Sequence, residues 1–217
     1  MKKAVVFDNS GTLIKRYRVI KDVINGIIFT DINSLDLIDQ ADALALVVLQ
    51  FNTNKLLKLD PDTLISDVIK EYGIDFDISF STKQVSKAEV KEILDTEKST
   101  TISDITDGFD ILREKISQME LCNGSALIVD MDLGIVAYTI TSAGRFFPKV
   151  FETVETLKSR GIEIFIASGD RKGAINRLAD MLDVPHDNAY GTVSTRGKCK
   201  VVSILQDSGY KIGRAHV

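Results

Sequence analysis

The stretch AVVFDNSGTL, residues 4–13, decides the fold that we expect for this chain. Its first four residues are apolar, which is typical of a strand buried on both faces of a parallel sheet. The carboxylate of Asp8 follows directly, and the turn-forming residues Asn-Ser-Gly-Thr come next. We therefore predict a buried strand at residues 3–7 that ends in a tight loop beginning with an acidic residue.

Strands and helices alternate in the C-terminal half of the sequence. IEIFIASGD, residues 162–170, is a second buried run that ends at small residues and an aspartate. This alternation predicts an α/β fold with a Rossmann-like parallel sheet. The helices that we expect here cover residues 148–161, 172–184 and 198–209, and a short strand covers residues 189–193.

The middle of the chain has a different pattern and separates the first strand from the strands that should pack beside it. Its predicted strands cover residues 43–51 and 76–80, and its predicted helices cover residues 62–73, 86–98 and 103–119. We therefore expect an inserted α+β cap domain at residues 16–122. The discontinuous core domain is expected at residues 1–15 and 123–217, with a hairpin that turns at residues 132–134.

Composition excludes several classes of partner. The 217 residues include 27 basic and 31 acidic side chains, and a net charge of −4 argues against nucleic acid as a main partner. No apolar run approaches the roughly 18 residues of a membrane span. Cys122 and Cys199 are far apart and typical of free thiols in a reducing compartment. We expect a cytoplasmic protein with no membrane partner, whose oligomeric state the sequence does not determine.

Three side chains that can do chemistry follow predicted strands or begin a predicted helix. Ligands of open parallel sheets bind at the carboxyl ends of the strands, where Asp8 and Ser168 are expected. A carboxylate there can hold a metal, act as a base or attack phosphorus, and it can also merely cap a turn. The hydroxyl of Ser168 and the ammonium of Lys198 would complete a clamp for a phosphoryl group.

The segments VVFDNSGTL, IASGD and KCKVVSILQ resemble the first three motifs of the haloacid-dehalogenase-like (HAD) hydrolase superfamily. Within it they are most similar to the phosphorylation domain of P-type ATPases, whose motifs are D-K-T-G-T-L, T-G-D and K-x-x-V-V-x-x-L-Q. The resemblance covers residues 2–13 and 123–209. It implies a HAD core with an inserted cap.

The resemblance also implies an activity and a role for each matching residue. We expect a Mg²⁺-dependent phosphohydrolase or phosphotransferase that acts on a small phosphorylated substrate through an aspartyl phosphate. Asp8 would be the nucleophile and a magnesium ligand, and Ser168 would bind the phosphoryl group. Lys198 would hold Asp8 and the phosphate together. Lys200 is a rival for this last role, but only Lys198 has the spacing of the motif. The backbone carbonyl of Ser10 would be a second magnesium ligand. The phosphate loop would comprise Asn9, Ser10, Gly11, Thr12 and Gly169.

Two features depart from the usual pattern of HAD phosphatases. Most of them carry a second aspartate, a general acid and base, where this chain has Ser10. P-type ATPases carry threonine there, so Ser10 predicts slow breakdown of the phosphoenzyme or reliance on another base. The fourth motif, G-D-G-x-x-D, is missing after residue 206. We expect that the natural chain continues with it and that residues 212–217 are foreign to that chain. The alternative is a catalytically weak or inactive binding or regulatory module with the HAD fold.

Overall fold

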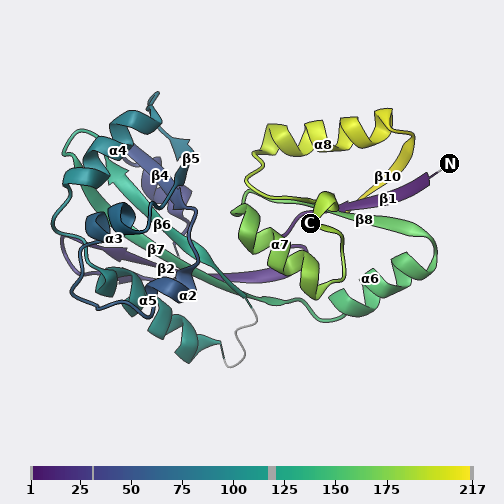
Figure 1. Cartoon of the computed structure of the whole chain (residues 1–217), viewed down its shortest axis with the longest axis horizontal. Helices are drawn as coiled ribbons and strands as arrows, with labels where there is room; N and C mark the ends of the chain where they lie inside the picture. The colour runs from purple at the N-terminus through teal and green to yellow at the C-terminus, as the bar shows by residue number, and fades with distance from the viewer. Residues whose placement is uncertain (1, 31, 117–120, 216–217) are drawn as a thin grey trace. The chain divides into compact units, whose positions relative to one another are not determined.

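The computed structural model describes residues 2–30, 32–116 and 121–215 (Figure 1). The chain divides into two compact units. The first is discontinuous and consists of Met1–Arg16 and Gly144–Val217, and the second is Tyr17–Ala143. Since the second unit is an insertion between the two segments of the first, each is described by itself.

The first unit is built on a four-stranded parallel sheet with the strand order β10-β1-β8-β9. The apolar N-terminal strand is central and pairs with both β8 and β10, which explains why its side chains are apolar on both faces. In the ladder with β8, Phe7 lies opposite Ile166. The strands are β1 (Lys2–Phe7), β8 (Ile162–Ala167), β9 (Ala189–Tyr190) and β10 (Tyr210–Ala215).

Helices cover both faces of this sheet. Helix α8 lies on one face and α6 and α7 lie on the other (Figure 1). On the α8 face, Val201, Val202 and Leu205 pack with Ala4 and Phe165 in one buried cluster. The helices are α6 (Val150–Ser159), α7 (Lys172–Met181), the short 3₁₀ helix η1 (His186–Asn188) and α8 (Thr195–Asp207).

The second unit contains a six-stranded sheet with the order β3-β2-β7-β6-β4-β5. Strand β4 pairs antiparallel with both β5 and β6, and β2 pairs antiparallel with β3. The strands are β2 (Ile14–Asp22), β3 (Ile28–Phe29), β4 (Leu44–Leu49), β5 (Phe76–Ser81), β6 (Leu121–Asp130) and β7 (Ile135–Phe146). The first residues of β2 and the last of β7 belong to the first unit, so these strands connect the two.

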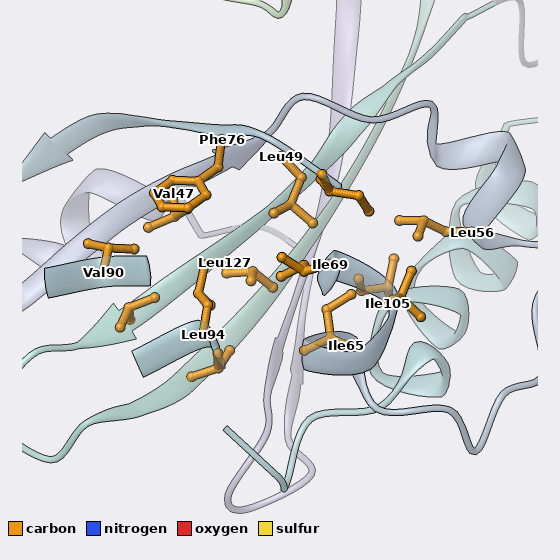
Figure 2. Close-up of a cluster of buried hydrophobic side chains, with 14 of the residues drawn as sticks. Val47, Leu49, Leu56, Ile65, Ile69, Phe76, Val90, Leu94, Ile105 and Leu127 are labelled. Atoms are coloured by element: carbon orange, nitrogen blue, oxygen red, sulfur yellow. The ribbon is translucent and has the colours of Figure 1, made fainter. Parts of the chain in front are cut away.

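A buried aliphatic cluster holds the helices of the second unit to its sheet. Figure 2 shows Leu94 and Val90 of α4 beside Leu127 of β6, with Ile65 of α3 in the same cluster. Within the described residues, no helix combines the length and the apolar character that crossing a membrane requires. The helices are α1 (Ser34–Ile38), α2 (Thr53–Leu56), α3 (Ile65–Glu71), α4 (Lys87–Thr96) and α5 (Ile102–Lys115).

The expected fold class, an α/β core on a parallel sheet with an inserted α+β unit, is confirmed. The boundaries differ from the expected ones, since the sequence placed the end of the insertion at residue 122 and the structure places it at Ala143. The reason is that β6 pairs with β4, with Leu44 opposite Asp130, so the hairpin β6–β7 belongs to the sheet of the insertion. Helix α8 also begins three residues earlier than expected, because the Ser194 side chain caps it.

We expect Leu94→Ala to destabilise the second unit, because the Leu94 side chain is 0% exposed and its removal leaves a cavity among packed aliphatic groups. The loss should be about 2–5 kcal/mol in the free energy of unfolding, measured by urea denaturation. The matched control is Leu133→Ala at the β6–β7 turn, where the side chain is 67% exposed and the change should be within about 0.5 kcal/mol. Equal losses in the two variants would contradict this packing.

Candidate active site

The loop after β1 is a tight turn held by its own backbone. The Asn9 carbonyl accepts hydrogen bonds from the N–H groups of Leu13 and Ile14 at 2.9 and 3.0 Å. Gly11 has φ +80°, a conformation that side chains with a Cβ rarely adopt, and its N–H donates to the Ile14 carbonyl at 2.9 Å. The Thr12 N–H donates to Asn9 O at 3.3 Å. The amides of Gly11 and Thr12 therefore stabilise the turn itself and are already engaged within the loop.

Asp8 and Lys198 form an ion pair at the carboxyl end of β1. The Lys198 Nζ lies 2.7 Å from Asp8 Oδ1, and the Asn9 backbone N–H donates to the same oxygen at 2.7 Å. The two side chains are 19% and 31% exposed, so the pair is sheltered but reachable from solvent. Lys198 reaches Asp8 from the first turns of α8, whereas Lys200 on the same helix is exposed. A carboxylate with a fixed cation beside it suits reaction with an anionic phosphate group.

Asp170 is the most connected side chain near this pair. Its Oδ2 accepts hydrogen bonds from Asn9 Nδ2 at 2.6 Å and from Ser168 Oγ at 2.8 Å, and its Oδ1 contacts Arg16 Nη2. Burial raises the pKa of Asp170, but the Arg16 charge and the hydrogen bonds from Asn9, Ser168 and Arg16 lower it, and the net pKa is below its ordinary value. Asp170 is thus held as a carboxylate by three partners.

The loop that carries Ser168 and Asp170 is fixed by the segment after β9. The Val193 N–H donates to Ser168 O at 2.9 Å, and the Thr192 N–H donates to Asp170 O at 2.6 Å. This close approach requires glycine at position 191, since a Cβ there would lie 2.5 Å from the Lys172 Cα. The end of β8, the segment after β9 and the start of α7 therefore form one packed region.

The structure brings some of the predicted residues into direct contact and links others only indirectly. Asp8 and Lys198 touch, and Asn9 adjoins both Asp8 and Asp170. Within the described residues, the contacts of the Ser168 hydroxyl are with Asp170, as donor to Oδ2 and as acceptor from its N–H at 3.2 Å. Ser168 is 3% exposed, while Gly169 beside it is exposed. The connection from Ser168 to Asp8 runs through Asp170 and Asn9.

The donor atoms at Asp8 fit the magnesium ion that the resemblance implies. Among the described residues, no three His, Cys, Asp or Glu side chains gather in a group that could hold a metal. Mg²⁺ keeps several waters and binds proteins through one or two carboxylates and the substrate phosphate, so it needs no such group. The Asp8 carboxylate and the Ser10 carbonyl are hard oxygen donors of this kind, and the Ser10 Oγ is buried with no hydrogen-bond partner among the residues that the structure describes. Asp170 is occupied by its three partners.

Arg16 is the site residue that sequence reasoning missed. It lies 154 residues before Asp170 in the chain, and a basic residue on a strand is ordinarily a solvent-facing one. Arg16 holds Asp170, and Asp170 contacts two residues of the predicted site, Asn9 and Ser168.

Comparisons with known proteins identify the family of this chain. A family model described as haloacid dehalogenase-like hydrolase matches residues 2–212. A protein of Methanocaldococcus jannaschii named Soluble P-type ATPase-like phosphatase is 35% identical over 211 residues, which are 97% of this chain and 74% of that protein. A copper-transporting ATPase of Saccharomyces cerevisiae is 35% identical over 57 residues, which are 26% of this chain and 6% of that protein.

Two solved structures of the catalytic domain of the CPx-ATPase CopB-B are also similar. They align with TM-scores of 0.42 and 0.41 at 13% and 16% identity, over 98% and 99% of this chain and 70% of each of theirs. The family assignment rests on the family model, which spans nearly the whole chain, and on the relative from Methanocaldococcus jannaschii. The chain belongs to the haloacid dehalogenase-like hydrolase family, and its expected resemblance to P-type ATPase phosphorylation domains is confirmed.

Proposed function

We propose that this hydrolase is a Mg²⁺-dependent phosphohydrolase that acts on a small phosphorylated substrate through an aspartyl phosphate on Asp8. The observation that carries the proposal is the contact of Lys198 Nζ with Asp8 Oδ1 at 2.7 Å, at the end of a parallel strand. The name of the Methanocaldococcus jannaschii relative supports a phosphate ester as the substrate class. The free thiol of Cys199 supports the cytoplasm as its location.

In the first step, a carboxylate oxygen of Asp8 attacks phosphorus. The new O–P bond forms as the bond from phosphorus to the leaving oxygen breaks, and the leaving group takes the electron pair and then a proton from solvent. The Lys198 ammonium offsets the negative charge shared by Asp8 and the phosphoryl oxygens. Both contacts of Asp8 described above use Oδ1, so we assign Oδ2 as the attacking atom.

In the second step, a water oxygen attacks the phosphorus of the aspartyl phosphate. The O–P bond to Asp8 breaks, the carboxylate is restored, the proton of the attacking water passes to solvent, and inorganic phosphate leaves. An enzyme with a carboxylate at position 10 could remove the proton of that water, but the Ser10 hydroxyl is too weak a base for this work. The phosphoenzyme should therefore be long-lived.

Three other groups complete the proposed site. The Asp8 carboxylate and the Ser10 carbonyl would hold Mg²⁺, which supplies Lewis-acid stabilisation of the phosphoryl oxygens when bound. Ser168 would turn its hydroxyl proton toward a phosphoryl oxygen while its oxygen still accepts from the Asp170 N–H, and the exposed Gly169 beside it leaves room for the approach. The loop after β1 would form the wall of the phosphate site with Asn9, Ser10, Gly11 and Thr12.

We expect hydrolysis of p-nitrophenyl phosphate to require both Mg²⁺ and Asp8. EDTA should remove the activity and Mg²⁺ should restore it, because the Lys198 charge alone does not offset the combined negative charge of a phosphate dianion and the Asp8 carboxylate. Asp8→Asn should remove the activity in the presence of Mg²⁺, since an amide cannot form the aspartyl phosphate. Equal release of nitrophenol by both proteins would favour the alternative, a HAD-fold binding or regulatory module.

Lys198→Ala should lower kcat by about 10²–10³-fold, which is the usual loss when one group that stabilises transition-state charge is removed. The matched control is Lys200→Ala, two residues further along the same helix and exposed, which should keep the wild-type kcat. Steady-state hydrolysis of p-nitrophenyl phosphate measures both. A larger loss in the Lys200 variant would reverse the assignment of the two lysines.

Ser10→Asp should accelerate breakdown of the phosphoenzyme, because it supplies the missing base. A general base contributes about 10²–10⁴-fold, so single-turnover measurements of the acid-stable phosphoenzyme should show its lifetime fall by up to that factor. Ser10→Asn has a similar volume but no base, and should leave the lifetime near that of the wild type. If both variants shorten the lifetime equally, Ser10 does not limit turnover.

A further inference from the structure

We infer that Arg16 is a positioning residue of the phosphate site, which holds Asp170 so that Asp170 in turn orients Asn9 and Ser168. The inference rests on the proposed function and adds to it a residue that lies outside the three motifs. Arg16 Nη2 contacts Asp170 Oδ1, while Asn9 Nδ2 and Ser168 Oγ donate to Oδ2 at 2.6 and 2.8 Å.

The two carboxylate oxygens of Asp170 have different partners. A carboxylate turns easily about its last side-chain torsion, so an unheld Asp170 could present either oxygen in many directions. Arg16 occupies Oδ1 and thereby fixes the direction in which Oδ2 points. Because Oδ2 accepts from both Asn9 and Ser168, that direction sets the positions of two side chains from different loops.

The charge of Arg16 has a second effect at this place. Asp170 and Arg16 are 10% and 22% exposed, so water and salt screen their charges poorly. Without Arg16, Asp170 would be an uncompensated negative charge beside Gly169, where the dianionic phosphate is proposed to bind. The Arg16 guanidinium compensates the Asp170 charge by direct contact. The Lys198 ammonium can then compensate the charges of Asp8 and the substrate.

Asn9 connects Asp170 to the nucleophile, because its side chain contacts Asp170 and its backbone contacts Asp8. Asn9 is 2% exposed, its backbone N–H donates to the nucleophile Asp8, and its carbonyl holds the turn. Because the side chain is buried, loss of its Asp170 acceptor would strain the packing around Asn9 and disturb the adjoining backbone next to Asp8. Misplacement of a reacting group by about 1 Å is enough to cost about 100-fold in rate.

The test compares Arg16→Gln and Arg16→Lys with the control Arg18→Gln. Arg18 lies on the same strand two residues away and donates to Ser34 Oγ at 2.9 Å instead. With p-nitrophenyl phosphate and Mg²⁺, Arg16→Gln should lower kcat by about 100-fold, Arg16→Lys should recover part of the loss, and Arg18→Gln should match the wild type. NMR should show the side-chain amide resonances of Asn9, assigned from their loss in Asn9→Ala, shifted in Arg16→Gln and unshifted in Arg18→Gln.

A folded Arg16→Gln variant with wild-type kcat and unshifted Asn9 resonances would overturn the inference. If Arg16→Gln does not fold, the double variant Arg16→Gln/Asp170→Asn decides, because it leaves no buried unpaired charge. Wild-type kcat in the folded double variant would overturn the inference, and a low kcat with shifted Asn9 resonances would support it. If the wild type itself is inactive, the proposed function fails, and the Asn9 resonances of the Arg16 and Arg18 variants alone decide whether Arg16 positions Asn9.

Discussion

The parallel pairing of β1 with β8 is the constraint on which the candidate site depends. With Phe7 opposite Ile166, the next residues of both strands emerge at the same edge of the sheet. Asp8 and the Ser168–Asp170 turn are then neighbours, although most of the chain separates them in sequence. A slip of one residue in this ladder would turn every side chain of β1 to the other face and carry Asp8 away from its partners.

Helix α8 supplies Lys198, the third residue of the site, at the same edge of the sheet. Its apolar side chains Val201, Val202 and Leu205 bind it to β1 and β8, and this packing brings Lys198 to Asp8. The same apolar stripe that stabilises the first unit thus also places the cation. Packing and chemistry use different residues of one helix, which is why the V-V-x-x-L spacing after the lysine is informative.

Local patterns in the sequence were sufficient to predict most of these components. The apolar run before Asp8 predicts a buried strand, and the Ser86 side chain caps α4 as its position suggests, with Glu89 completing a capping box. The assignment of the β6–β7 hairpin required knowledge of its partner β4, which no local pattern supplies. The role of Arg16 could not be predicted for the same reason, because it depends on an ion pair with Asp170, which lies 154 positions away.

The discontinuous first unit has a consequence for how the chain acquires its structure. Strand β1 is made first, but the strands on either side of it, β8 and β10, follow only after the whole of Tyr17–Ala143. The inserted unit can complete its own sheet while β1 is still unpaired. Until then, the backbone groups and apolar side chains of β1 are exposed to solvent. Folding of the first unit therefore loses the entropy of closing a long loop before β1 gains any strand pairing. This makes folding of that unit slow and exposes β1 to aggregation during synthesis.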